Sequence, residues 1–127
     1  MRRVLLGLAL AVVLHATDEK SSEHKTFSGV RELVIDNVSG FIEVTATSGS
    51  SVEMEIEKTL SGESADRLSL ARKEISLTTT QEGGLVRLLV DGPFRCHCSE
   101  NSINFRGHDV YQFNYDFKVR VPRDVKL

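Results

Sequence analysis

The chain has 127 residues, of which 40% are hydrophobic and 6% aromatic, and its formal net charge is −2. A chain of this length fits a single domain that can bury a hydrophobic core without obligatory disulfides. The acidic balance argues against nucleic acid and anionic membrane surfaces as the main partners.

The N-terminus has the pattern of a secretory signal peptide. Arg2 and Arg3 precede the apolar run V-L-L-G-L-A-L-A-V-V-L, and Ala16 supplies a small residue for cleavage. The run is too short for a membrane-spanning helix, which needs about 20 residues. We therefore expect residues 1–16 to be removed and residues 17–26 to be a flexible linker. The product, with 14 basic and 18 acidic residues (14 − 18 = −4), is expected to be secreted or periplasmic.

Three strands are expected after the linker, at residues 31–36, 41–46 and 51–60. Turns are expected at 37–40 and 47–51, where asparagine, serine and glycine gather. The third strand alternates between apolar residues, which should face inward, and glutamates, which should face solvent. The inward set is Val52, Met54 and Ile56, and the outward set is Glu53, Glu55 and Glu57.

The hydrophobic period changes after Ser61. Apolar residues then recur at the spacing of one helical face, at Ala65, Leu68, Ala71 and Ile75. This predicts one short helix over about Glu63–Lys73, with Ser61 as its N-cap and an ion pair between Glu63 and Arg67.

Strand character returns in the second half of the chain. Glu74–Thr80 and Leu85–Asp91 are expected to form a hairpin, and the polar segment Gly92–Asp109 is expected to be a long exposed loop. Tyr111–Val121 then alternates strictly between apolar and polar residues, which predicts a long β-strand. Its apolar side should pack near Leu68. Its polar side carries Gln112, Asn114, Asp116, Lys118 and Arg120. A strand of this kind left at a sheet edge is expected to self-associate.

The stretch L-V-I-D-N-V-S-G-F-I-E-V-T-A, followed by S-G-S-S-V-E-M-E-I-E-K, resembles the opening of a domain family of bacterial secreted or envelope proteins. That family is labelled adhesin and is largely of unknown function. The resemblance covers about Phe27 to Leu127. It implies a mainly β fold, with a sheet module that is antiparallel or solenoid-like and one short helix. Family members continue with repeats of the kind Asn-Gly-x-Ile-x-Val, so residues 27–127 are expected to be a domain truncated at its C-terminus or a minimal member. The matching positions are Leu33, Ile35, Asn37, Gly40, Ile42, Val44, Gly49, Val52 and Lys58.

Cys96-His97-Cys98 is the sharpest local motif. In an extended strand the two cysteine Cα atoms would lie about 6.6 Å apart, near the upper limit for a disulfide. A turn at His97 would bring them closer, so a disulfide between Cys96 and Cys98 is one interpretation. Incidental loop cysteines are a second. A metal site with His108 and Asp109 is a third, although the spacing differs from that of common zinc sites. No cofactor is assigned on this basis.

No common catalytic motif such as G-x-S-x-G or H-E-x-x-H occurs in the sequence. We therefore expect a non-enzymatic structural or adhesive binding module whose partner is an unknown protein or glycan at the cell envelope. One alternative is a metal-binding or redox-sensing module that uses Cys96, Cys98 and His108. Another is the N-terminal part of an envelope hydrolase whose active site lies outside this chain. No membrane-spanning segment is expected once the signal is cleaved.

Overall fold

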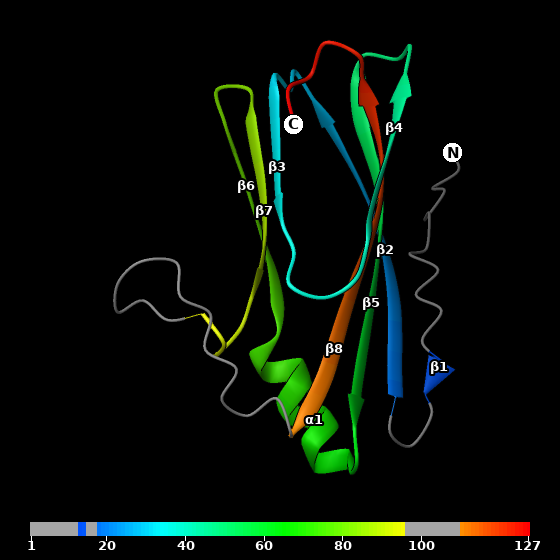
Figure 1. Ribbon diagram of the computed structural model, residues 1–127. Helices are drawn as coiled ribbons and strands as arrows, with labels where there is room; N and C mark the ends of the chain where they lie inside the picture. The colour runs from blue at the N-terminus through cyan, green and yellow to red at the C-terminus, as the bar shows by residue number, and fades with distance from the viewer. Residues whose placement is uncertain (1–12, 15–17, 96–109) are drawn as a thin grey trace, which may run out of the picture.

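The computed structural model describes residues 13–14, 18–95 and 110–127. Two mixed β-sheets face each other, and the helix α1 (Ala65–Glu74) lies at one end of them (Figure 1). The mainly β fold expected from the sequence is confirmed. The sheets are open, and both combine parallel with antiparallel pairing.

The large sheet has the strand order β1–β2–β5–β8–β4, and the small sheet has the order β3–β7–β6. The large sheet is made of β1 (Val13–Leu14), β2 (Asp18–Ser28), β4 (Ile42–Thr47), β5 (Ser51–Gly62) and β8 (Tyr111–Pro122). The small sheet is made of β3 (Glu32–Asp36), β6 (Ser76–Glu82) and β7 (Leu85–Asp91). The predicted hairpin is β6–β7, which turns at Gly83 and Gly84 with φ of +54° and +90°. Two positive φ angles in succession match the tight turns that follow the twist of paired strands.

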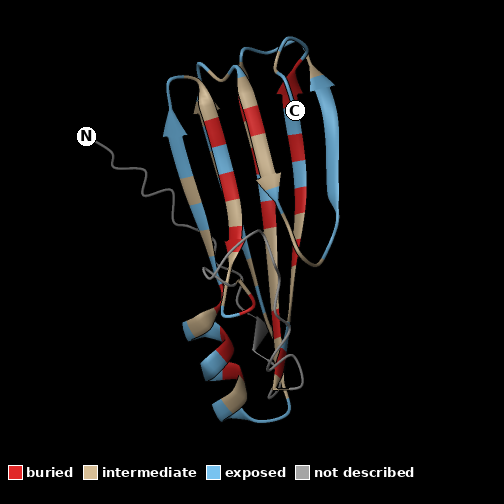
Figure 2. Ribbon diagram, turned by 60° about the vertical axis from the view of Figure 1, so that its left-hand side comes forward, coloured by how far each residue is buried: buried red, intermediate tan, exposed pale blue. Residues whose placement is uncertain are grey.

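The core lies between the sheets and is built from alternate residues of β5, β7 and β8. Red bands of buried residues mark these strands in Figure 2. The predicted alternation of β8 is confirmed, and Tyr115, Phe117 and Val119 are almost fully buried. The hydroxyl of Tyr111 donates to Glu74 Oε1 over 2.8 Å, which joins the start of β8 to α1. Leu68 of α1 belongs to the same buried cluster.

The helix begins later than expected. Ser64, not Ser61, is the N-cap, and its Oγ accepts a hydrogen bond from the backbone N–H of Arg67 over 3.2 Å. Ser61 belongs to β5, because pairing with β2 and β8 extends the strand as far as Ser61 and Gly62. The predicted ion pair between Glu63 and Arg67 is present at 2.9 Å. In the described part of the chain, no helix combines the length and the apolarity that crossing a membrane requires.

The expected flexible linker at residues 17–26 is wrong over most of its length. Asp18–Ser28 forms β2, which pairs with β5 in antiparallel register along its whole length. The strand carries polar side chains on both faces apart from Phe27. β2 is held in the sheet by backbone hydrogen bonds to β5. Backbone pairing does not require alternating apolar residues, so the sequence carries no hydrophobic period that would predict the strand.

The turn Asn37–Gly40 connects strands of different sheets. β3 pairs in parallel with β7, and β4 pairs in parallel with β8. The side chain of Asn37 holds the turn to β8, because its Nδ2 donates to the carbonyl oxygen of Tyr115 over 2.9 Å. The segment β3–turn–β4 therefore adds one edge strand to each sheet, β3 beside β7 and β4 beside β8. We call this segment the β3–β4 layer.

This arrangement bears on the self-association expected of Tyr111–Val121 if that strand were left at a sheet edge. β8 pairs with β5 from Tyr111 to Arg120, and its second half, from Phe117 to Pro122, also pairs with β4. The outer strand on this side of the large sheet is β4. Self-association through β8 itself is therefore not available in that second half.

Candidate functional site

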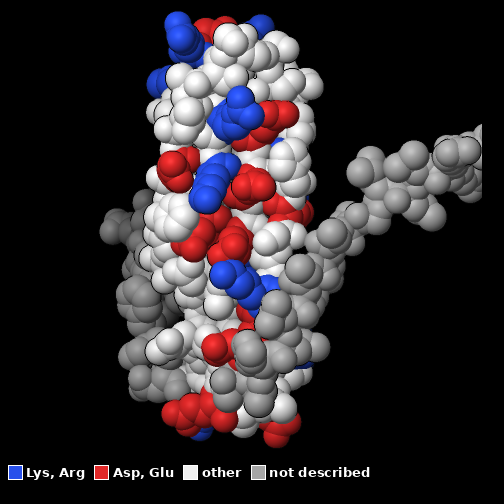
Figure 3. Space-filling view, turned by 90° about the vertical axis from the view of Figure 1, so that its right-hand side faces the viewer, with Lys and Arg blue, Asp and Glu red and all other residues white. Residues whose placement is uncertain are grey.

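The outer face of the large sheet carries charged residues from neighbouring strands in register. Glu53 of β5 lies opposite Arg120 of β8, and Glu55 lies opposite Lys118. The second row extends to His24 on β2 and to Glu43 on β4. Figure 3 shows acidic and basic groups interleaved along this face. We call this set the polar ladder: His24, Glu43, Thr45, Glu53, Glu55, Lys118 and Arg120.

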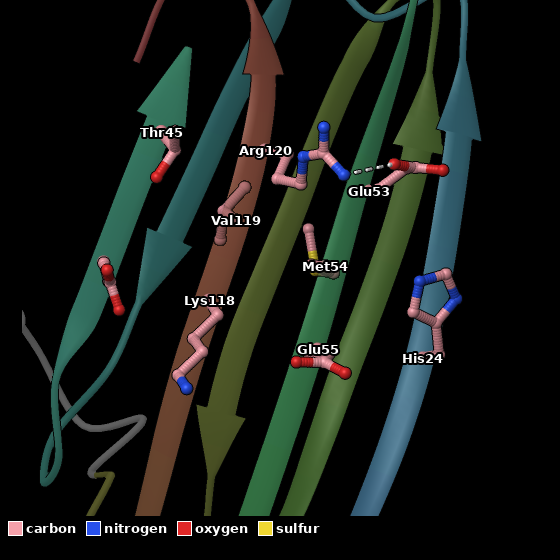
Figure 4. Close-up of a pocket in the computed structure, with 9 residues that line it drawn as sticks. His24, Thr45, Glu53, Met54, Glu55, Lys118, Val119 and Arg120 are labelled. Carbon is pink, nitrogen blue, oxygen red and sulfur yellow. Dashed lines mark ion pairs between the residues drawn. The ribbon is translucent and has the colours of Figure 1, made fainter. Parts of the chain in front are cut away.

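The polar ladder surrounds a shallow depression of about 420 Å³ (Figure 4). Arg120 Nη1 lies 3.8 Å from Glu53 Oε2, and both side chains are largely exposed. An exposed ion pair of this kind contributes about 0–1 kcal/mol to stability. The ladder therefore adds little to folding, and its charges are free to meet a charged surface.

The ladder exists because β5 and β8 each bury one face. Val52, Met54 and Ile56 fill the core, so the residues between them must point outward. The predicted outward positions of the β5 glutamates and of the polar residues of β8 are confirmed by this arrangement. Interleaved charges favour a partner whose own charges alternate at the strand spacing. They set specificity and association rate more than affinity.

A second hollow, of about 380 Å³, lies between the sheets beside β2, β6 and the end of α1. Its inner wall carries Lys58, an inward position of β5. Lys58 Nζ donates to the carbonyl oxygen of Ile75 over 3.0 Å and lies 5.7 Å from the centre of the Tyr115 ring. Burial lowers the pKa of Lys58, and the nearby carboxylates of Glu19 and Glu23 partly oppose that shift.

Ion pairs stand around the mouth of this hollow. Arg72 Nε lies 2.8 Å from Glu19 Oε2, and Lys25 Nζ lies 2.8 Å from Glu23 Oε1. Burial also raises the pKa of Tyr115 to about 12, so its hydroxyl is neutral at physiological pH. Lys58 and Tyr115 thus both line the hollow.

The β3–β4 side of the molecule presents an apolar edge. Phe41, Ile42 and Val44 are 47%, 42% and 43% exposed. Ile42 and Val44 are in register with Phe117 and Val119, which are buried. The inner face of the large sheet therefore continues onto β4 without being covered there by any described residue.

The residues singled out by sequence reasoning for disulfide or metal chemistry lie outside the described residues. These are Cys96, His97, Cys98, His108 and Asp109. Within residues 18–95 and 110–127, no group of three or more His, Cys, Asp and Glu side chains is placed to hold a metal ion. His24 was expected in the linker and instead stands on β2 within the polar ladder.

Sequence reasoning missed Lys58 as an inward residue. The signal was present, because Lys58 continues the series Val52, Met54 and Ile56 in the same phase. It also missed that His24 and Glu43 belong to the ladder. The sequence of one strand does not show which strands lie beside it in the sheet.

Comparisons with protein families, with curated proteins and with solved structures found no match to this chain.

Proposed function

We propose that this chain is a secreted, non-enzymatic structural or adhesive binding module that meets its partner through the polar ladder. The partner is a protein or glycan at the cell envelope. The observation that carries this proposal is the in-register row of alternating charges across β2, β5, β8 and β4. The signal-like N-terminus and the resemblance to the adhesin-labelled envelope family support the location.

The ladder suits binding because its charged side chains form few close ion pairs with other described residues of the chain. The Arg120–Glu53 pair is long and exposed, and among the described residues Lys118 forms no ion pair within 4.0 Å. When a partner with complementary charges binds to the ladder, these water-screened contacts would be replaced by partly desolvated ion pairs with the partner. Attraction of this type weakens as salt screens the charges.

We also propose that the architecture is solenoid-like. This proposal is supported by the parallel pairing of β3 with β7 and of β4 with β8. The β3–β4 segment thus runs in the same direction as the β7–β8 segment beside it. Further Asn-x-x-Gly-x-Ile-x-Val units in the coding sequence beyond Leu127 would support this proposal. A continuation with a different period would count against it.

Charge reversal tests the binding proposal. Arg120→Glu and Lys118→Glu should each reduce binding to an array of envelope proteins and bacterial surface glycans by about 10-fold, since each 1.4 kcal/mol is a factor of ten. Arg87→Glu is the matched control, because Arg87 is exposed on β7 of the other sheet. Equal loss in all three variants, or reproducible turnover of a small substrate, would overturn the proposal.

A further inference from the structure

We infer that β4 is a homodimerisation edge, at which a second copy of this chain adds its own β4 in antiparallel orientation. This edge adjoins the polar ladder, which includes Glu43 and Thr45 of β4, but the inference rests on strand pairing and does not depend on the proposed function. Alternate residues of β4 direct their peptide groups toward β8. The carbonyl oxygen of Phe41 accepts from the N–H of Phe117 over 2.9 Å. In a parallel pair the bonds of one strand to its neighbour come from every second residue. The peptide groups of Ile42, Val44 and Ala46 therefore point away from β8, toward the open side.

The side chains of β4, together with Phe41 directly before it, add an apolar surface. Phe41, Ile42 and Val44 are among the few large hydrophobic side chains exposed in the described structure. The pale blue of exposed residues runs along β4 in Figure 2, next to the red bands of β8. An edge strand with unpaired peptide groups and apolar side chains is a template for pairing with another strand.

The other strand edges are better protected. β2 is protected by charged residues along the strand, among them Glu19, Lys20, Glu23 and Lys25. The outer side of β3 is already engaged, because the N–H of Lys126 donates to Arg31 and the N–H of Leu33 donates to Lys126. β6 is polar, with three consecutive threonines, Thr78, Thr79 and Thr80. Within the described chain, β4 is thus the apolar edge that lacks such protection.

The sequence of β4 selects one pairing register. An antiparallel pair centred on Val44 places Ile42 opposite Ala46 of the second copy and Glu43 opposite Thr45. Its outward-pointing peptide groups then form up to about six hydrogen bonds. A pair centred on Glu43 would place two carboxylates directly opposite each other, which is unfavourable.

Charge continuity supports the same register. Across the joined sheet the row would read Glu55, Lys118, Glu43 and then Thr45, Arg120 and Glu53 of the second copy. Acidic and basic residues alternate through this row, and no like charges lie directly opposite each other. The apolar faces of the two β4 strands also extend one another on the core side. A second copy is therefore complementary to this edge in backbone, side-chain polarity and charge.

The test is the oligomeric state of the full chain by analytical ultracentrifugation over a wide concentration range. We expect a concentration-dependent dimer that Val44→Lys abolishes. Leu70→Lys is the control, because Leu70 is an exposed apolar residue on α1, away from this edge, and its replacement should leave the dimer intact. A monomer at every concentration, or a dimer that survives Val44→Lys, would overturn the inference.

Crosslinking provides a second readout that does not depend on the folding of Val44→Lys. In a Cys96→Ser/Cys98→Ser background, Val44→Cys should be joined by a short bismaleimide, because the two copies of residue 44 would lie about 5.5 Å apart. Thr47→Cys should not, since its two copies would be about 20 Å apart at the rise of an antiparallel strand. Equal crosslinking of both variants would refute the register. A monomer in which β4 amides resist hydrogen exchange would show that the chain covers this edge itself, and would also overturn the inference.

Discussion

Replacing Gly40 with alanine is expected to detach the β3–β4 turn from β8. Gly40 has a φ of +117°, and a Cβ added there would lie 1.9 Å from the carbonyl oxygen of Tyr115. The backbone conformation alone costs an L-residue about 1–3 kcal/mol. Ordinary contact begins near 3.4 Å, so the turn and β8 must move apart by 3.4 − 1.9 = 1.5 Å.

A movement of this size breaks the hydrogen bonds that hold the turn. The N–H of Tyr115 donates to Ser39 over 2.8 Å, and Asn37 Nδ2 donates to the Tyr115 carbonyl over 2.9 Å. Each such bond contributes about 0.5–1.5 kcal/mol. Together with the backbone strain, Gly40→Ala should lower the free energy of unfolding by about 2–6 kcal/mol. That is a large share of the ordinary stability of a domain, about 5–15 kcal/mol.

Urea unfolding followed by far-UV circular dichroism measures this loss, and Gly29→Ala is the matched control. Gly29 also has a positive φ, of +68°, but a Cβ there would meet nothing within 4 Å. Its replacement should cost only the left-handed backbone term, about 1–2 kcal/mol. If Gly40→Ala is no more destabilising than Gly29→Ala, the close approach of the turn to β8 is refuted.

Two further predictions concern the buried polar groups. Burial raises the pKa of both tyrosines, Tyr111 and Tyr115, the latter from 10.0 to about 12. The folded state thus prefers the neutral phenols, and their contribution to stability is complete below pH 10 and is lost as the pH rises toward about 12. Tyrosinate absorbance should show a midpoint above 10 in the native protein, and a native midpoint equal to that in urea would contradict this. Lys58→Met should change the free energy of unfolding by less than about 1.5 kcal/mol, because methionine can fill the same space. Lys58→Glu should cost more than about 3 kcal/mol, because it sets a carboxylate against the Ile75 carbonyl. Urea unfolding compares the two variants, and equal losses would disprove the inward position of Lys58.

The sequence was most informative where one strand alone buries one face. The alternation of Tyr111–Val121 and of Ser51–Leu60 predicted both strands and their inward residues. Burial of one face requires apolar residues at every second position, and this pattern is visible within the sequence of each strand. The Glu63–Arg67 ion pair was predictable for a similar reason, since helical neighbours are also neighbours in sequence. The exact N-cap was not, because Ser61 and Ser64 are equally suitable residues and strand pairing decided between them.

Features that depend on distant partners could not be predicted. β2 is polar on both faces apart from Phe27, so its sequence resembles a linker over most of its length until β5 is beside it. The parallel layer formed by β3 and β4 was likewise hidden, because its partners are in the second half of the chain. The polar ladder followed the same rule: its β5 and β8 residues were predicted, and its β2 and β4 members were not.

The position of β8 between β5 and β4 constrains the order of folding. The β6–β7 hairpin closes over Gly83 and Gly84 and can form locally. By contrast, Ile42 pairs with Phe117, which is 117 − 42 = 75 residues later. β4 is synthesised early, but it can pair with β8 only after residues 111–122 have been synthesised. Folding of the large sheet should therefore end with the insertion of β8, a slow step because pairing over such separations needs costly loop closure.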